Sequence, residues 1–116
     1  FKQVNDTHGH LVGDQVIRTV AQILAAAIRG LDSVGRYGGE EFLAILPNTP
    51  LKYASEVFER MRQRVETSSI IEGESVTVSI GVADYRGGPI EEFIQQADEC
   101  LYAAKHSGRN RVVSLH

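Results

Sequence analysis

The chain has 116 residues, which leaves room for one domain or part of one and not for two. Hydrophobic residues make up 42% and charged residues 23%, a composition that excludes a disordered or fibrous protein. Twelve Lys and Arg against fifteen Asp and Glu give a net charge of −3, so no general positive field exists to hold a nucleic acid. We therefore expect no nucleic-acid partner.

The apolar segments and the cysteine indicate where the protein works. The longest apolar stretch, residues 23–28, is far shorter than the roughly 20 residues that cross a bilayer, and no signal-peptide pattern opens the chain. We expect a cytoplasmic location; a membrane anchor, if the full-length protein has one, would lie in upstream segments. The single cysteine, Cys100, lies between Ala97 and Leu101 in the sequence, which predicts a small buried side chain rather than a reactive thiol.

The first half of the chain predicts a helix, a hairpin and a second helix. Apolar residues recur at helical spacing from Val12 to Arg29, and Gly30 would end this helix. Strands at 33–37 and 42–46 follow, joined by a tight glycine turn, and the continuous apolar run of the second strand predicts burial on both of its faces. Thr49 then stands where a residue would cap a helix that begins with Pro50 in its first turn.

The second half predicts a strand, a helix and a short strand. After a turn at residues 72–74, apolar residues alternate with others from Val76 to Val82, as in a strand with two unlike faces. The third helix, residues 89–106, has acidic residues in its first turn and basic residues in its last. Its inward face is predicted to carry Ile90, Phe93, Ile94, Ala97, Leu101 and Ala104. Residues 111–115 form the last strand.

The order α-ββ-α-β-α-β predicts the fold class α+β. Its front matches a ferredoxin-like βαββαβ unit, with helices packed on a sheet, from which the opening strand is missing. Phe1 opens a polar, turn-rich stretch, so we expect the missing strand to precede it and the sheet to lack an inner member. We thus expect residues 1–116 to form one domain that is partial at its N-terminus.

The tip of the predicted hairpin carries chemistry. Glu40 and Glu41 follow Gly38 and Gly39, which have no side chains to block a ligand. Mg²⁺ prefers one or two carboxylates together with phosphate oxygens, the arrangement that serves in-line phosphoryl displacement. Taken alone, the same residues also fit a simple Gly-Gly turn with solvated glutamates.

Polar residues before and within the first helix form a second candidate group. Asn5 and Asp14 could together read the hydrogen-bonding edge of a purine. Alternatively, Asn5 lies in a turn and Asp14 only favours the helix N-terminus. His8 and His10 are two residues apart without a third ligand nearby, so we interpret His10 as a loop residue that packs or hydrogen-bonds.

Two further pairs of charged residues stand near helix ends. Lys105 and Arg109 are four residues apart and could both reach phosphates, or could simply favour the helix C-terminus. Arg29 and Asp32, taken alone, predict a salt bridge at a helix end.

In this order and combination, the residues resemble the GGDEF domain of diguanylate cyclases. The likeness is carried by FKQVNDTHGHLVGD at the start, RYGGEEF at 36–42, VTVSIGVA at 76–83 and ADECLYAAKHSGRNRV at 97–112. It covers essentially the whole chain, and Glu40 stands where the family more commonly has Asp. The fold implied is the one related to nucleotidyl cyclase and polymerase palms.

The resemblance implies an activity and a residue set. Two GTP molecules, each bound with Mg²⁺ or Mn²⁺ in one of two paired domains, would be joined into cyclic di-GMP with release of two pyrophosphates. Glu40 would bind the metal and help deprotonate the attacking 3′-hydroxyl, and Glu41 would support the metal site. The implied substrate contacts are Gly38, Gly39, Lys105 and Arg109 at the phosphates, Asn5 and Asp14 at guanine, and His10 in the loop between them.

The resemblance also implies regulation. An R-x-x-D motif five residues before the signature is the family's inhibitory site, so Arg29 and Asp32, completed by Arg60, would bind cyclic di-GMP as product and inhibitor. A homodimer and an upstream sensor domain would be the partners in the full-length protein.

A departure from the family and two alternative functions complete the interpretation. The family's metal-binding Asp lies upstream of Phe1, so we expect this segment alone to be inactive or poorly folded. One alternative is a regulatory GGDEF module that binds GTP or cyclic di-GMP without turnover. Another, an interaction module without a nucleotide role, leaves the matching charged positions unexplained.

Overall fold

The computed structural model of the chain describes residues 9–68, 70–71 and 76–114. Three helices of 17 residues and four short strands follow one another as α2 (His10–Ala26), β1 (Ser33–Arg36), β2 (Phe42–Ile45), α3 (Leu51–Thr67), β3 (Ile80–Val82), α4 (Ile90–His106) and β4 (Val112–Ser114). The α+β class is confirmed. No helix in this described part is long and apolar enough to span a membrane.

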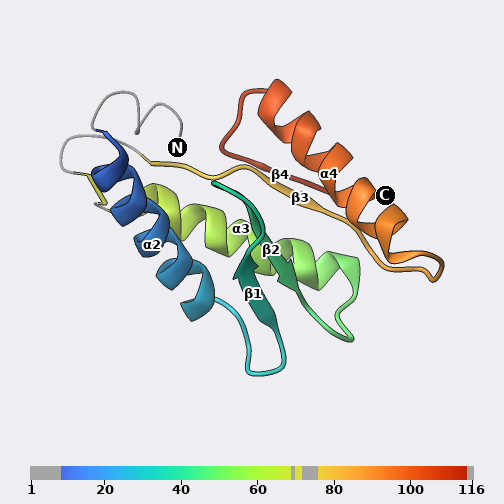
Figure 1. The fold of residues 1–116 in the computed structure, drawn as a ribbon. Helices are drawn as coiled ribbons and strands as arrows, with labels where there is room; N and C mark the ends of the chain where they lie inside the picture. The colour runs from blue at the N-terminus through green and yellow to red at the C-terminus, as the bar shows by residue number, and fades with distance from the viewer. Residues whose placement is uncertain (1–8, 69, 72–75, 115–116) are drawn as a thin grey trace.

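The strands form two separate pairs. β1 and β2 are antiparallel, with Arg36 opposite Phe42 next to the turn, and β3 and β4 are parallel, with Ile80 opposite Val112. Among the residues that the structure describes, no hydrogen-bonded strand joins one pair to the other. Figure 1 shows α4 on one side of β3 and β4, which also contact α3.

The buried core lies where α2, α3 and β3 meet. Its four most deeply buried large side chains are Val16 and Val20 of α2 and Met61 and Val65 of α3. Each such side chain contributes roughly 1.5–3 kcal/mol when it leaves water. The helical spacing of apolar residues predicted for the first helix is thus confirmed by the burial of Val16 and Val20.

Gly81 sets how closely β3 approaches α4. A Cβ atom built on Gly81 would collide with the carbonyl oxygen of Ala97 and the backbone nitrogen of Leu101. The strand can therefore lie directly on the helix backbone only because residue 81 has no side chain. On the same face of α4, Cys100 is buried and free, and burial raises the pKa of its thiol. The prediction that Cys100 is buried is confirmed.

Two predicted helix ends are wrong. α2 ends at Ala26, with Ala27 as its C-cap, and Gly30 lies beyond it. The chain leaves the helix early because the backbone N–H of Arg29 donates to the Asp32 carboxylate instead of a helix carbonyl. Thr49 does not cap α3; its hydroxyl donates to the carbonyl of Pro47 and accepts a hydrogen bond from Arg29.

Three predictions of strand extent and burial are also wrong. β2 is half-buried and not covered on both faces, since it pairs only with β1 and leaves Ile45 52% exposed. The strand predicted from Val76 begins at Ile80, where pairing with β4 starts, and Ile90 at the start of α4 is exposed. The predicted turn at 72–74 lies outside the described residues.

Candidate functional site

The glycine hairpin presents a five-residue turn, residues 37–41, at the ends of β1 and β2. Its backbone closes through N–H groups of Tyr37 and Gly38 that donate to the carbonyl of Glu41, at 2.8 and 3.3 Å. The Arg36 guanidinium lies against the turn, its Nε donating to the carbonyl oxygens of Gly39 at 2.9 Å and Gly38 at 3.1 Å. Arg36 therefore fixes the shape of the turn, a role that its place in the motif did not reveal.

The two glycines of the turn serve no packing purpose. A Cβ atom on Gly38 or Gly39 would meet no atom of the described residues within 4 Å, and neither glycine has the left-handed φ that favours glycine. The fold itself would accept larger residues here. Empty space around a glycine pair would let a ligand phosphate approach closely, and the same space is also that of the plain exposed turn described above.

Glu40 and Glu41 follow as exposed side chains on this turn. Carboxylate oxygens are the hard ligands that suit Mg²⁺ and Mn²⁺. No group of three or more possible ligating side chains occurs within the described ranges. The two glutamates thus fit a part of a divalent-cation site, one that phosphate oxygens or water would have to complete.

A second turn, residues 107–111, joins α4 to β4. Lys105 lies in the last turn of α4, and the backbone N–H of Arg109 donates to the carbonyl of Ala104 at 2.9 Å, which closes the helix end. The side chains of Lys105 and Arg109 are both exposed. Within the part of the chain that the structure describes, neither side chain makes an ion pair or a hydrogen bond. Two cations are therefore available for an anionic ligand. Figure 1 shows this turn and the hairpin turn both toward the top of the view.

Arg29 and Asp32 form the predicted salt bridge. The Arg29 guanidinium donates through Nε to Asp32 Oδ2 at 3.0 Å and through Nη2 to Oδ1 at 2.9 Å, and the Arg29 backbone N–H adds a third bond at 2.9 Å. These bonds hold the pKa of the Asp32 carboxyl below its usual value. The Asp32 side chain is fully buried while that of Arg29 is 56% exposed, so only the arginine offers a surface to a ligand.

Of the other predicted site residues, the structure describes the side chains of Asp14 and Arg60 but not those of Asn5 and His10. Asp14 is exposed in α2 but lies beyond its first turn, which has no acidic residue; its predicted role as a charge at the helix N-terminus is thus wrong. Arg60 is exposed on α3, without a recorded bond to Arg29 or Asp32. Asn5 lies outside the described residues. His10 is the first residue of α2, so its predicted place in the loop is wrong, and its side chain lies outside the described part of the chain.

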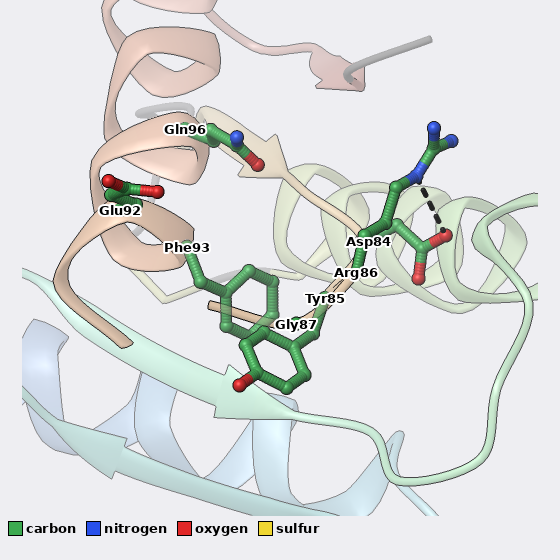
Figure 2. A pocket seen from close by; sticks show the side chains of 7 residues that line it. All are labelled: Asp84, Tyr85, Arg86, Gly87, Glu92, Phe93 and Gln96. Carbon is green, nitrogen blue, oxygen red and sulfur yellow. Dashed lines mark ion pairs between the residues drawn. The ribbon is translucent and has the colours of Figure 1, made fainter. Parts of the chain in front are cut away.

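A hollow of about 170 Å³ lies elsewhere, between the loop after β3 and the start of α4. Figure 2 shows its lining, with the rings of Tyr85 and Phe93 facing each other at 5.1 Å between centroids and Arg86 Nε 3.7 Å from Asp84 Oδ2. None of the residues predicted to bind nucleotide or metal lines it. The candidate site is therefore the pair of turns, an open surface of the α+β domain.

Comparison with known proteins identifies the class to which this domain belongs. A family profile described as "Diguanylate cyclase, GGDEF domain" matches residues 1–111. Diguanylate cyclase A of Treponema denticola is 44% identical over 117 residues, covering 97% of this chain and 32% of the relative. The response regulator PleD of Caulobacter vibrioides is 45% identical over 120 residues, covering 97% and 26%. The chain spans about a third or less of these relatives.

Solved structures agree. Diguanylate cyclase SiaD of Pseudomonas aeruginosa, in complex with its activator SiaC, has a TM-score of 0.93 at 43% identity, with 98% of this chain and 45% of that chain covered. The active GGEEF domain of a diguanylate cyclase from Vibrio cholerae has a TM-score of 0.91 at 33% identity, covering 99% and 76%. The chain belongs to the GGDEF domain family of diguanylate cyclases, and the expected family and fold are confirmed.

Proposed function

We propose that the protein containing this chain is a diguanylate cyclase, which joins two GTP molecules into cyclic di-GMP with release of two pyrophosphates. The observation that carries the proposal is the turn at Gly38 and Gly39, which has open space where side chains would lie and is followed by two exposed carboxylates. Support also comes from the active GGEEF domain of Vibrio cholerae, since Glu40 gives this chain the same GGEEF signature.

The residues of the two turns divide the reaction between them. The glycines let the triphosphate approach the hairpin, and Glu40 accepts the proton of the attacking 3′-hydroxyl. The new bond joins the 3′-oxygen to the α-phosphorus of the other GTP, and the bond to the leaving pyrophosphate breaks. Lys105 and Arg109 bind the phosphates where negative charge grows as pyrophosphate departs. Asn5 and Asp14 bind guanine, and His10 is a further residue that contacts the substrate.

A divalent cation completes this proposed site. The carboxylates of Glu40 and Glu41 would hold Mg²⁺ or Mn²⁺, which supplies charge neutralisation at the phosphates when bound. The chain spans about a third or less of the relatives that it matches, so the full-length protein is the form in which activity is expected.

Catalysis would need two copies of the domain. Each copy contributes one GTP, so a homodimer is the proposed working form, controlled by an upstream sensor domain in a cytoplasmic protein. On dilution the rate per molecule should therefore fall as the two copies separate. A rate per molecule that stays constant on dilution well below the concentration at which sedimentation shows monomers would contradict the two-copy mechanism.

Feedback inhibition by cyclic di-GMP is proposed at Arg29, Asp32 and Arg60. The buried Asp32 carboxylate orients the half-exposed guanidinium of Arg29, which can then meet a phosphate or a guanine edge. The related DgcB domain of Caulobacter crescentus was solved in complex with c-di-GMP. Arg29→Ala should relieve inhibition by added cyclic di-GMP while turnover persists; unchanged inhibition would remove this assignment.

Product analysis tests the main proposal. The full-length protein is incubated with GTP and Mg²⁺, and nucleotides are separated by chromatography beside a Glu40→Ala variant of matched thermal stability. We expect cyclic di-GMP from the native protein and loss of at least about 1000-fold in the variant, since the carboxylate serves both metal and proton transfer. A folded native protein that binds GTP without forming product would favour the regulatory-module alternative.

A further inference from the structure

Arg62 of α3 lies at the centre of a polar network that reaches the second turn. Its Nε donates to Glu59 Oε1 at 2.8 Å, one helical turn earlier, and its Nη1 donates to Asn110 Oδ1 at 2.9 Å. The same Nη1 lies 3.5 Å from Glu66 Oε2. The side-chain amide of Asn110 donates a hydrogen bond to this carboxylate oxygen as well. One guanidinium therefore joins α3 to the turn that follows α4.

Burial makes this network stronger than an ordinary surface pair. The Arg62 side chain is only 14% exposed, although its two acidic partners are about 40% exposed. The neighbouring carboxylates raise the pKa of its guanidinium. Hydrogen bonds to a charged group in a shielded place are worth more than neutral ones in water, so Asn110 has one well-defined place.

The backbone of the second turn requires such a support. Arg109 and Asn110 have φ values of 61° and 45°, the left-handed region that costs non-glycine residues free energy. The Asn110 N–H also donates to Ser79 Oγ at 3.2 Å, just before β3. With its side chain fixed by α3 and its N–H fixed by Ser79, Asn110 holds the turn in this conformation.

We propose that Arg62 is a positioning residue for Arg109: by holding Asn110, it keeps the turn that presents the Arg109 side chain to an anionic ligand. This inference rests on the proposed role of Arg109 as a GTP phosphate-binding residue. Arg109 itself has no side-chain partner among the described residues, so its backbone alone limits where the side chain can reach. The control of that backbone lies one residue away, at Asn110.

A double-mutant cycle in the full-length protein tests the proposal through the affinity for GTP, measured by displacement of a fluorescent GTP analogue and by KM. Arg62→Gln should weaken GTP binding by about fivefold to tenfold, as expected from the loss of charged hydrogen bonds, with a smaller change in kcat. Arg64→Gln is the matched control, since Arg64 is an exposed arginine of the same helix without a recorded partner in the described chain. It should leave GTP affinity within about twofold.

The double variant decides whether Arg62 acts through Arg109. If it does, Arg62→Gln should cost nothing further once Arg109→Ala is present. Independent, additive losses would overturn the inference, as would an Arg62→Gln variant that binds GTP normally while Arg109→Ala does not. If Arg109→Ala alone leaves GTP affinity unchanged, the proposed function of Arg109 fails first and the inference falls with it.

A conservative variant separates positioning from charge. Arg62→Lys keeps the positive charge between Glu59 and Glu66 but lacks the planar fork that serves Glu59 and Asn110 together. We expect its thermal stability to lie near that of the native protein and its GTP affinity to stay weakened. Full recovery of GTP affinity by lysine would show that charge alone matters and would contradict the positioning role.

Discussion

The two turns of the candidate site are built in opposite ways. In the hairpin turn, residues 37–41 are all exposed, and the Arg36 guanidinium donates to the carbonyl oxygens of Gly38 and Gly39. In the turn after α4, Asn110 is half-buried and bound by side chains of α3 and by Ser79. One turn is open to ligands, and the other is fixed to the core.

This difference matches the tasks proposed for the two turns. A surface that binds phosphates and a cation must leave space for them. The hairpin turn leaves this space at Gly38 and Gly39, which have no side chains. A cation that stabilises a leaving group must already point in the right direction, because reorganisation during the reaction would raise its barrier. The fixed turn therefore suits Arg109, and the open turn suits Glu40.

The largest expected effect comes from filling the open turn. Gly39→Val should leave the fold intact, because no described atom lies within 4 Å of the added Cβ, and should lower cyclic di-GMP formation by about 100-fold through displaced phosphates. Gly35→Val is the control, since Gly35 of β1 also has open space but lies outside the turn. Thermal melting and product chromatography check both variants. Native activity in Gly39→Val would contradict the role given to the open turn.

Gly81 packs against α4, so its substitution should lower the stability of the fold, whereas substitution of Gly39 should lower activity. Gly81→Ala places a methyl group against the backbone of α4, which we expect to cost about 3 kcal/mol of unfolding free energy and to lower Tm by about 10 °C or more. Gly35→Ala should change Tm by much less. Chemical denaturation and thermal melting measure the effect. An unchanged Gly81→Ala variant would mean that β3 and α4 are not in close contact.

The smallest expected effect concerns pH and the Arg29–Asp32 pair. Because the folded-state pKa of Asp32 is lowered, its carboxylate stabilises the fold above its unfolded pKa of about 3.9, and this contribution is lost as pH falls further. Asp32→Asn should thus melt a few degrees below the native protein at pH 7, and the difference should shrink below about pH 4. Asp98→Asn, at an exposed position of α4, is the control. A difference that is constant with pH would exclude the ion pair as its cause.

The sequence predicted the parts of this molecule that depend on local pattern. Helical and alternating spacings located the three helices of the described residues and the hairpin, and Gly38 and Gly39 stood out as a glycine pair that no packing contact requires. The helix stop at Gly30 was wrong because the Asp32 carboxylate competes with helix carbonyls for the Arg29 N–H, and the cap at Thr49 was wrong because the Arg29 guanidinium competes with the helix N-terminus for the Thr49 hydroxyl. That competition depends on the tertiary structure.

Arg62 illustrates what remained out of reach. In the sequence it is one of several charged residues of an amphipathic helix, with Glu59 and Glu66 at ordinary helical spacing. Its contact with Asn110 spans 48 positions, and nothing local signals it. The burial of β2 was likewise misjudged because it depends on which strands lie beside it.

The central claim is that the open hairpin turn and the fixed turn after α4 bind the same triphosphate. The most direct measurement is a crystal structure of the full-length protein with Mg²⁺ and a non-hydrolysable GTP analogue. We expect the phosphates to lie against Gly38 and Gly39, with oxygens within hydrogen-bond distance of Lys105 and Arg109. A triphosphate bound elsewhere, such as in the hollow beside Tyr85, or bound at the hairpin without contact to Arg109, would contradict the account.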